Sequence, residues 1–252
     1  MKIIWLASYP KTGGTYLSTL ISSYFYGIPD QSAEIGNKIL DIHMLQAENK
    51  FLKGESKSTI FLKGHYLYSE SLPYYEHIVG FVYLVRNPRD VLLSSARYIG
   101  AFKNKNTLRE FAISFIDNLG APVWRSSNMG TFPENVASWL GATSYLPHLF
   151  IKYEELRQSP IQTMEKLVKF FGAEVDQKKI QYVVDQCSIE KAREIEIKEK
   201  SQGIVSLYPE LPDGEPFVGQ GKMGQSLTEL GEDIEMRYLQ RFGKFINVLG
   251  YN

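Results

Sequence analysis

A lysine, two threonines and two adjacent glycines lie together near the start of the chain. The segment reads Ile3-Ile4-Trp5-Leu6-Ala7-Ser8-Tyr9-Pro10-Lys11-Thr12-Gly13-Gly14-Thr15-Tyr16-Leu17. It predicts a buried strand, a tight turn at the glycines and the first turn of a helix. Backbone N–H groups converge at such a turn, and the helix dipole adds positive potential there. Because Lys11 adds a full charge and Thr12 and Thr15 add hydroxyl donors, the segment predicts a phosphate or sulfate site.

The order of these residues differs from that of a Walker A loop. That motif has four residues between its first glycine and a Gly-Lys-Ser/Thr end. Here Lys11 comes before Gly13 and Gly14, so the lysine would approach the anion from the strand side. An ordinary strand–turn–helix connection with a surface lysine remains the alternative at this point.

Length and composition limit the classes of protein to consider. The chain has 252 residues, 44% of them hydrophobic, which is enough for one sizeable core, so we expect a single domain over residues 1–252. Lysine plus arginine and aspartate plus glutamate both number 28, which argues against a nucleic-acid polymer as partner. The single cysteine, Cys187, fits a reducing compartment. No segment approaches the ~20 apolar residues of a membrane span, and no secretory leader is recognisable, so a cytoplasmic protein is expected.

Strand and helix patterns alternate along the chain. Strands are expected at 3–7, 59–65, 78–86 and 149–153, and helices at 17–26, 36–52, 89–99, from 160 onward and at 233–248. This alternation predicts an α/β fold with a central parallel sheet flanked by helices.

Polar side chains follow four of the expected strands at the points where these strands end. They are Lys11, His65, Arg86 and Tyr153. Ligands of parallel sheets bind at the carboxyl ends of the strands. The sequence therefore predicts that these four side chains share one binding site.

Two regions lack strand signals. Residues 100–141 are rich in aromatic side chains, and residues 188–231 contain a charged helical run followed by a segment rich in proline and glycine at 201–216. Long loops in compact domains often cover active sites, so we expect a mobile lid around 190–231.

Four segments together resemble the PAPS-dependent sulfotransferases, where PAPS is 3′-phosphoadenosine 5′-phosphosulfate. Residues 9–16 resemble the 5′-phosphosulfate loop of that family, and Leu-Lys-Gly-His at 62–65 resembles its Lys-x-His segment. Arg-Asn-Pro-Arg-Asp at 86–90 resembles its second signature, in which a serine follows the arginine by eight positions, as Ser94 follows Arg86. Residues 217–224 resemble its C-terminal Gly-x-x-Gly loop. The resemblance covers nearly the whole chain. It implies a three-layer P-loop-like fold, PAPS as sulfuryl donor, no metal, and a small-molecule, lipid or carrier-bound hydroxyl as acceptor, as in class EC 2.8.2.

The resemblance also implies residue roles for an in-line transfer. Lys11 would contact the leaving phosphate, a contact worth about 10²–10³ in rate. His65 would be the general base, worth about 10²–10⁴, and Lys63 would stabilise the transferring sulfuryl group. Arg86 and Ser94 would hold the 3′-phosphate, and Tyr153 would contact the adenine. The other implied donor contacts are Thr12, Gly13, Gly14, Thr15, Tyr16, Gly221 and Lys222.

Structural roles remain open for the same side chains. Lys11 could bind phosphate without aiding the reaction, and His65 could be an ordinary structural histidine. Arg86 could close an ion pair with Asp90 or Glu154. Tyr153 could simply pack in the core.

The chain departs from the family pattern at three places. Gly14 stands where many members have a threonine, and Tyr16 replaces the usual tryptophan. Where many members have Arg-Lys-Gly in the C-terminal loop, this chain has Gly-Gln-Gly at 219–221. We therefore expect Lys222, the next residue, to supply one charge to the 3′-phosphate.

Two other classes of protein compete with this interpretation. A P-loop kinase or related nucleotide phosphotransferase is disfavoured by the missing Gly-Lys-Ser/Thr end and by the lack of a clear acidic metal ligand at a strand end. A non-catalytic nucleotide-binding protein is disfavoured by the presence of Lys11, Lys63 and His65.

The sequence leaves the acceptor and the oligomeric state open. Aromatic residues in and beside the two strand-poor regions favour an apolar or ring-bearing acceptor, although core packing would explain them equally well. They are Tyr98, Phe102, Trp124 and Phe132.

Overall fold

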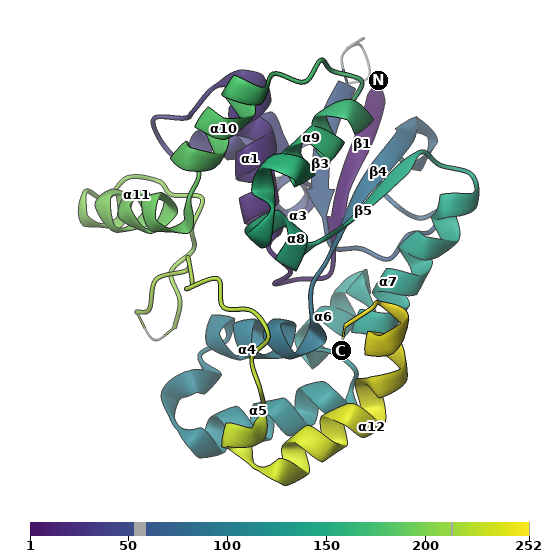
Figure 1. Cartoon of the computed structure of the whole chain (residues 1–252), viewed down its shortest axis with the longest axis vertical. Helices are drawn as coiled ribbons and strands as arrows, with labels where there is room; N and C mark the ends of the chain where they lie inside the picture. Colours follow the sequence, from purple (N-terminus) through teal and green to yellow (C-terminus); the bar gives the residue numbers. More distant parts are fainter. Residues whose placement is uncertain (53–58, 213, 252) are drawn as a thin grey trace.

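The molecule is built around a sheet of five parallel strands, seen in a computed structural model that describes residues 1–52, 59–212 and 214–251 (Figure 1). The strands are β1 (Lys2–Ser8), β2 (Ile39–Asp41), β3 (Thr59–Gly64), β4 (Ile78–Val85) and β5 (His148–Lys152). Their order across the sheet is β2-β3-β1-β4-β5, and every neighbouring pair is parallel. This confirms the α/β fold with a central parallel sheet.

Alternate residues of the central strands point into two separate cores, because side chains of a strand alternate between its faces. Trp5 of β1 and Tyr83 of β4 belong to one core, and Leu6 and Leu84 belong to the other. Both faces are therefore covered, which explains why β4 is apolar without interruption.

Helices form a layer on each face of the sheet. The core that contains Leu6 is closed by α1 (Gly14–Tyr26), α8 (Tyr153–Gln158), α9 (Pro160–Phe170) and α10 (Gln177–Gln186). The core that contains Trp5 is covered by α7 (Phe132–Gly141) and extends to α5 (Lys105–Asp117) and α12 (Glu232–Val248). The result is the three-layer arrangement that the sequence resemblance implied.

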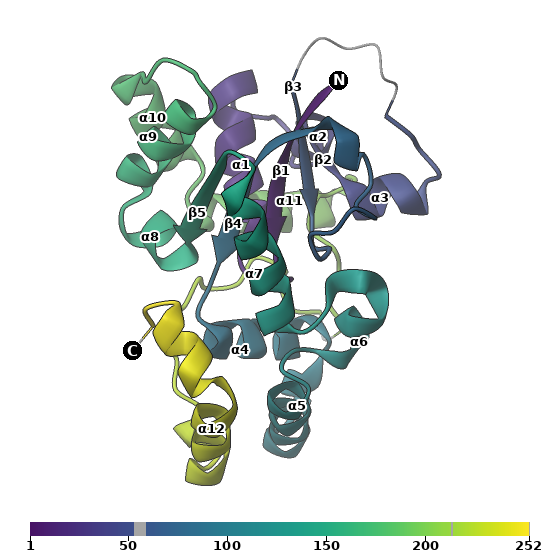
Figure 2. The ribbon, with the colours of Figure 1, turned by 90° about the vertical axis from the view of Figure 1, so that its right-hand side faces the viewer.

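The carboxyl ends of the strands face a group of helices below the sheet, α4 (Pro88–Tyr98), α5 and α12 (Figures 1 and 2). Helix α4 begins directly after β4 because Asn87 caps it by accepting a hydrogen bond from the Arg89 N–H, and Pro88 occupies its first position. The site residues of β4 and α4 are therefore fixed by one short connection.

The other helices are shorter or lie at the edges of the molecule. They are α2 (Ala33–Lys38), α3 (Ile42–Ala47), α6 (Pro122–Trp124), α11 (Ile189–Ser201), the 3-10 turns Tyr75–His77, Ala101–Lys103, Ala142–Ser144 and Thr228–Leu230, and a π-type turn at Arg125–Met129. Within the described ranges, no helix is both long enough and apolar enough to span a membrane.

The expected strands at 3–7, 59–65, 78–86 and 149–153 are confirmed, with ends within one residue of the observed ones. The helix expected at 36–52 is wrong, because β2 interrupts it between α2 and α3. Ile39 and Leu40 pair with Phe61 and Leu62 of β3, so backbone pairing along the sheet edge outweighs the local helical preference. Asp41 then starts α3 by accepting a hydrogen bond from the His43 N–H.

Candidate active site

A cavity of about 1640 Å³ lies at the carboxyl ends of the strands. Nearly all the residues that the sequence predicted for the site contribute to its wall. These are Lys11, Gly13, Gly14, Thr15, Tyr16, Lys63, His65, Arg86, Ser94, Tyr153, Gly221 and Lys222. The structure therefore brings the ends of separate strands together around one cavity.

The turn between β1 and α1 has the backbone shape that an anion-binding loop needs. Gly13 has φ of 103°, a region that favours glycine, and a Cβ there would lie 2.5 Å from the ring of Tyr153. Lys11 also has positive φ, 67°. The turn therefore depends on glycine at position 13, and the loop packs closely against the start of α8.

Thr12 differs from the expectation. Its side chain is buried, and its hydroxyl donates to the carbonyl oxygen of Tyr9 at 2.9 Å. The hydroxyl therefore stabilises the turn from inside, so Thr15 is the threonine of this loop that reaches the cavity wall.

The Lys11 ammonium lies between two aromatic rings. It is 4.1 Å from the ring centroid of Tyr98 on α4 and 4.3 Å from that of Phe217. Burial, together with the nearby charges of Lys63, Arg97 and Arg86, lowers the pKa of Lys11 to about 7. The lysine is therefore held in a positive, partly dehydrated environment that an anion would relieve.

Arg86 forms no ion pair with any residue that the structure describes. Its guanidinium donates to the backbone oxygens of Lys11 at 3.2 Å and Lys222 at 2.8 Å, and stacks 4.3 Å above the ring of Tyr153. Its Nε is buried and has no partner within the described residues.

The two acidic residues that could have paired with Arg86 are engaged elsewhere. Asp90 accepts from the Gly224 N–H at 3.0 Å, and Glu154 accepts from the Asn87 N–H at 3.0 Å. Arg86 therefore does not form the alternative ion pair with Asp90 or Glu154. A phosphate group would satisfy the buried Nε.

One ring nitrogen of His65 is engaged in a hydrogen bond to the backbone. Its Nδ1 lies 2.8 Å from the carbonyl oxygen of Ser8, which can only accept, so Nδ1 carries the proton and Nε2 has the free lone pair. Asn135 of α7 fixes the backbone by donating to the carbonyl oxygen of His65 at 2.8 Å. Burial, followed by the charge of Lys63, lowers the pKa of His65 to about 3, so the ring is neutral near pH 7.

Lys63 is paired with a residue that the sequence analysis did not identify. Its Nζ lies 3.0 Å from Oδ2 of Asp41 at the end of β2. The ammonium lowers the pKa of Asp41 against the raising effect of burial. Asp41 was missed because its strand was taken for part of a helix. The pairing register sets Asp41 opposite Lys63.

Positive charge dominates the cavity. Of the described residues, eight lysines and arginines line it against three carboxylates, Asp41, Glu48 and Glu215. Among the residues that the structure describes, no group of three or more histidine, cysteine, aspartate or glutamate side chains is arranged to bind a metal ion. The site thus fits a ligand with more than one anionic group.

The aromatic residues named in the sequence analysis divide into two groups. Tyr98, Phe102 and Trp124 line the cavity. Phe132 is fully buried in the core instead, so core packing explains it.

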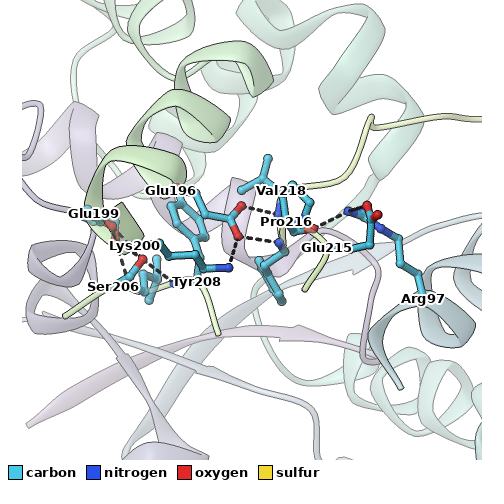
Figure 3. A network of polar contacts seen from close by, with 12 residues as sticks. Arg97, Glu196, Glu199, Lys200, Ser206, Tyr208, Glu215, Pro216 and Val218 are labelled. Atoms are coloured by element: carbon cyan, nitrogen blue, oxygen red, sulfur yellow. Dashed lines mark hydrogen bonds and ion pairs between the residues drawn. The ribbon is translucent and has the colours of Figure 1, made fainter. Parts of the chain in front are cut away.

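Two buried carboxylates of α11 hold the segment that follows this helix (Figure 3). Glu196 accepts from the Phe217 and Val218 N–H groups at 2.6 and 2.8 Å and pairs with Lys200 Nζ at 2.6 Å. Glu199 accepts from the Ser32 N–H at 2.6 Å and from the Ser206 hydroxyl at 2.7 Å. The ring of Phe217, which covers Lys11, is thereby anchored through its own backbone.

Comparison with known proteins gives one consistent family. A family model described as the sulfotransferase domain matches residues 2–238. Sulfotransferase 4A1 of mouse is 22% identical over 96% of this chain and 80% of its own length. Cytosolic sulfotransferase 5 of Arabidopsis thaliana is 28% identical over 77% of this chain and 65% of its own length.

Solved structures share the fold. A retinol dehydratase in complex with retinol and PAP has a TM-score of 0.71 at 17% identity, over 98% of this chain and 82% of that one. Mouse sulfotransferase SULT7A1 complexed with PAP has a TM-score of 0.60 at 17% identity, over 96% of this chain and 84% of that one.

Proposed function

The chain belongs to the sulfotransferase family, and on this premise we propose that it transfers a sulfuryl group from PAPS to the hydroxyl of a small-molecule acceptor. PAPS supplies the sulfuryl group when bound: its sulfur–oxygen bond to the phosphate breaks, the acceptor oxygen becomes bonded to sulfur, and PAP (adenosine 3′,5′-bisphosphate) leaves. The EC 2.8.2 class follows from this reaction and is part of the proposal.

Lys11 is the residue that stabilises the leaving phosphate. Support comes from its position after β1, its positive φ and the cationic surroundings that lower its pKa. In such buried, positively charged surroundings, the Lys11 ammonium is stabilised strongly by negative charge that develops beside it on the leaving phosphate. The rings of Tyr98 and Phe217 hold it on the cavity wall.

His65 is the general base. Its Nε2 accepts the proton of the acceptor hydroxyl while Nδ1 keeps its own proton on Ser8. Lys63, tethered to Asp41, lies on the same cavity wall and stabilises negative charge on the sulfuryl oxygens. The remaining wall residues, Arg86 and Ser94 among them, bind the nucleotide.

The lid over the donor is the segment around 190–231, which begins with α11 and continues through residues 202–231. Its support is positional: Phe217 to Lys222 line the cavity, while Glu196 and Glu199 anchor the segment from α11. A lid held by a few buried hydrogen bonds can open without disturbing the sheet.

The observation that carries the proposal is the meeting of Lys11, His65 and Arg86 on one cavity wall from three adjacent strands. Calorimetric titration of the protein with PAP in EDTA tests it. We expect saturable binding of PAP. In a parallel titration without EDTA, excess ATP with Mg²⁺ should not displace it. Preference for ATP with Mg²⁺ would instead support the kinase alternative.

A cytoplasmic location and a single domain over residues 1–252 complete the proposal. The name of the Arabidopsis relative, cytosolic sulfotransferase 5, supports the location. The buried, unpaired thiol of Cys187 is compatible with a reducing compartment. Subcellular fractionation of the tagged protein tests the location.

A further inference from the structure

Arg97 occupies the place where a cation of the C-terminal loop would be expected. It lies on α4, three residues after Ser94 and therefore on the same helix face, and its side chain lines the cavity. A Cβ built on Gly219 would lie only 2.5 Å from Arg97 Nη1. The guanidinium thus fills the space into which a side chain at position 219 would project.

The loop beside it carries little charge of its own. Residues 219–221 are Gly-Gln-Gly, and the next residue, Lys222, is largely exposed. Lys222 reaches Arg86 through its backbone, since its carbonyl oxygen accepts from Arg86 Nη2 at 2.8 Å. The loop is therefore flanked by two guanidinium groups, Arg86 on one side and Arg97 on the other.

The present partners of Arg97 are weak competitors for an anion. It donates to the carbonyl oxygen of Pro216 and lies 3.9 Å from a carboxylate oxygen of Glu215, whose side chain is 63% exposed (Figure 3). An exposed ion pair of this length contributes little, whereas a guanidinium fork matches two phosphate oxygens at once.

We infer that Arg97 binds the 3′-phosphate of the donor nucleotide together with Arg86 and Ser94, in place of the cations absent from residues 219–221. The inference rests on the proposed function, because it assumes a nucleotide with a 3′-phosphate. It assigns to α4 a charge that the sequence analysis had assigned to Lys222. The influence of Arg97 on the pKa of Lys11 agrees with its position in the same cationic pocket.

A purely structural role for Arg97, as a tether of the lid through Pro216, must be distinguished from phosphate binding. Arg97→Gln keeps an amide donor for the Pro216 oxygen but removes the charge. The measurement is the calorimetric Kd for PAP and for 5′-AMP, which lacks the 3′-phosphate. We expect PAP affinity to fall about tenfold to hundredfold, the range for a lost charge-assisted hydrogen bond, with 5′-AMP affinity unchanged.

Arg109→Gln is the matched control. Arg109 of α5 also donates to a backbone oxygen of the later segment, that of Leu230, and also pairs with a carboxylate, Asp233, but it lies outside the cavity. We expect it to leave both affinities unchanged. Lys222→Ala is expected to reduce PAP affinity less than Arg97→Gln does.

A compensating pair of substitutions sharpens the test. Gly219→Arg in the Arg97→Ala background puts the cation back on the loop, into the space that Arg97 vacates. Position 219 has no positive φ that would strain a side chain. We expect the double variant to recover most of the preference for PAP over 5′-AMP that Arg97→Ala loses.

The inference is overturned if Arg97→Gln leaves the PAP to 5′-AMP preference intact, or if it weakens both ligands equally, as a lid tether would. It is also overturned if Lys222→Ala alone abolishes the preference. Failure of the proposed function looks different, because the unsubstituted protein would then show no preference for PAP over 5′-AMP.

Discussion

His65 Nδ1 lies 2.8 Å from the carbonyl oxygen of Ser8, and this contact determines which nitrogen of the ring is available for chemistry. A carbonyl oxygen only accepts, so the proton stays on Nδ1 and Nε2 is the basic nitrogen. Ser8 is the last residue of β1 and His65 follows β3 directly. The base is therefore oriented by the same strand that ends at the Lys11 loop.

His65→Asn is expected to lower kcat by about 10²–10⁴, because the amide still donates to Ser8 but cannot act as a base. PAP affinity should change little, since the ring does not contribute charge near neutral pH. Steady-state kinetics and PAP titration measure the two effects. His77→Ala, on an exposed turn, is the control. Undiminished kcat in His65→Asn would remove the general-base assignment.

PAP binding should take up a proton at Lys11 above pH 7. In the protein without nucleotide the pKa of Lys11 is about 7, and only the protonated side chain attracts the anion. The apparent Kd should therefore rise, up to about tenfold per pH unit, between pH 7 and pH 9. Calorimetry in buffers of different ionisation enthalpy measures the uptake directly.

Lys11→Arg is the control for this effect, because a guanidinium stays charged over the whole range. It should bind PAP without proton uptake. If the unsubstituted protein bound PAP equally well at pH 7 and pH 9, with no buffer dependence, the environment assigned to Lys11 would be wrong.

Adjacent glycines in the first loop should respond differently to alanine. Gly13→Ala places a side chain at φ of 103° and 2.5 Å from the Tyr153 ring. The free energy of unfolding should therefore fall by about 1–3 kcal/mol. At Gly14 the nearest atoms are 3.5 Å away, and alanine favours the helix that starts there, so stability should change by less than about 1 kcal/mol. Urea unfolding compares the two. Equal losses would contradict the close packing of this turn.

Glu196→Gln should loosen the lid. One amide oxygen cannot replace two carboxylate oxygens that serve Phe217, Val218 and Lys200, and an unsatisfied buried donor costs about 1–3 kcal/mol. Hydrogen exchange at Phe217 and Val218 should accelerate, and PAP affinity should fall. Glu194→Gln, on the exposed face of α11, is the control. Unchanged exchange in Glu196→Gln would show that the hydrogen bonds of Glu196 to Phe217 and Val218 do not hold the segment.

Local patterns were sufficient to predict much of the fold and site. The apolar run of β4 and the glycine turn after β1 are recognisable because their neighbours in sequence are also their neighbours in space. Lys11, His65 and Arg86 could be grouped for a different reason, because each follows a strand and the carboxyl ends of parallel strands lie at one edge of the sheet.

Residues whose role depends on distant contacts were not predictable in this way. Asp41 belongs to a three-residue strand that exists through pairing with β3. The role inferred for Arg97 depends on its contact with Gly219, which lies far from it in sequence and has no side chain to fill the same space. Its spacing of one helical turn from Ser94 was the available signal.

Sulfuryl transfer itself can be followed with ³⁵S-labelled PAPS and a panel of phenols and aliphatic alcohols, in EDTA, with PAP release measured in parallel. We expect labelled product and PAP in equal amounts with at least one acceptor class, and strongly reduced transfer by His65→Asn. Absence of PAP release across the panel, or phosphoryl transfer from ATP that requires Mg²⁺, would contradict it.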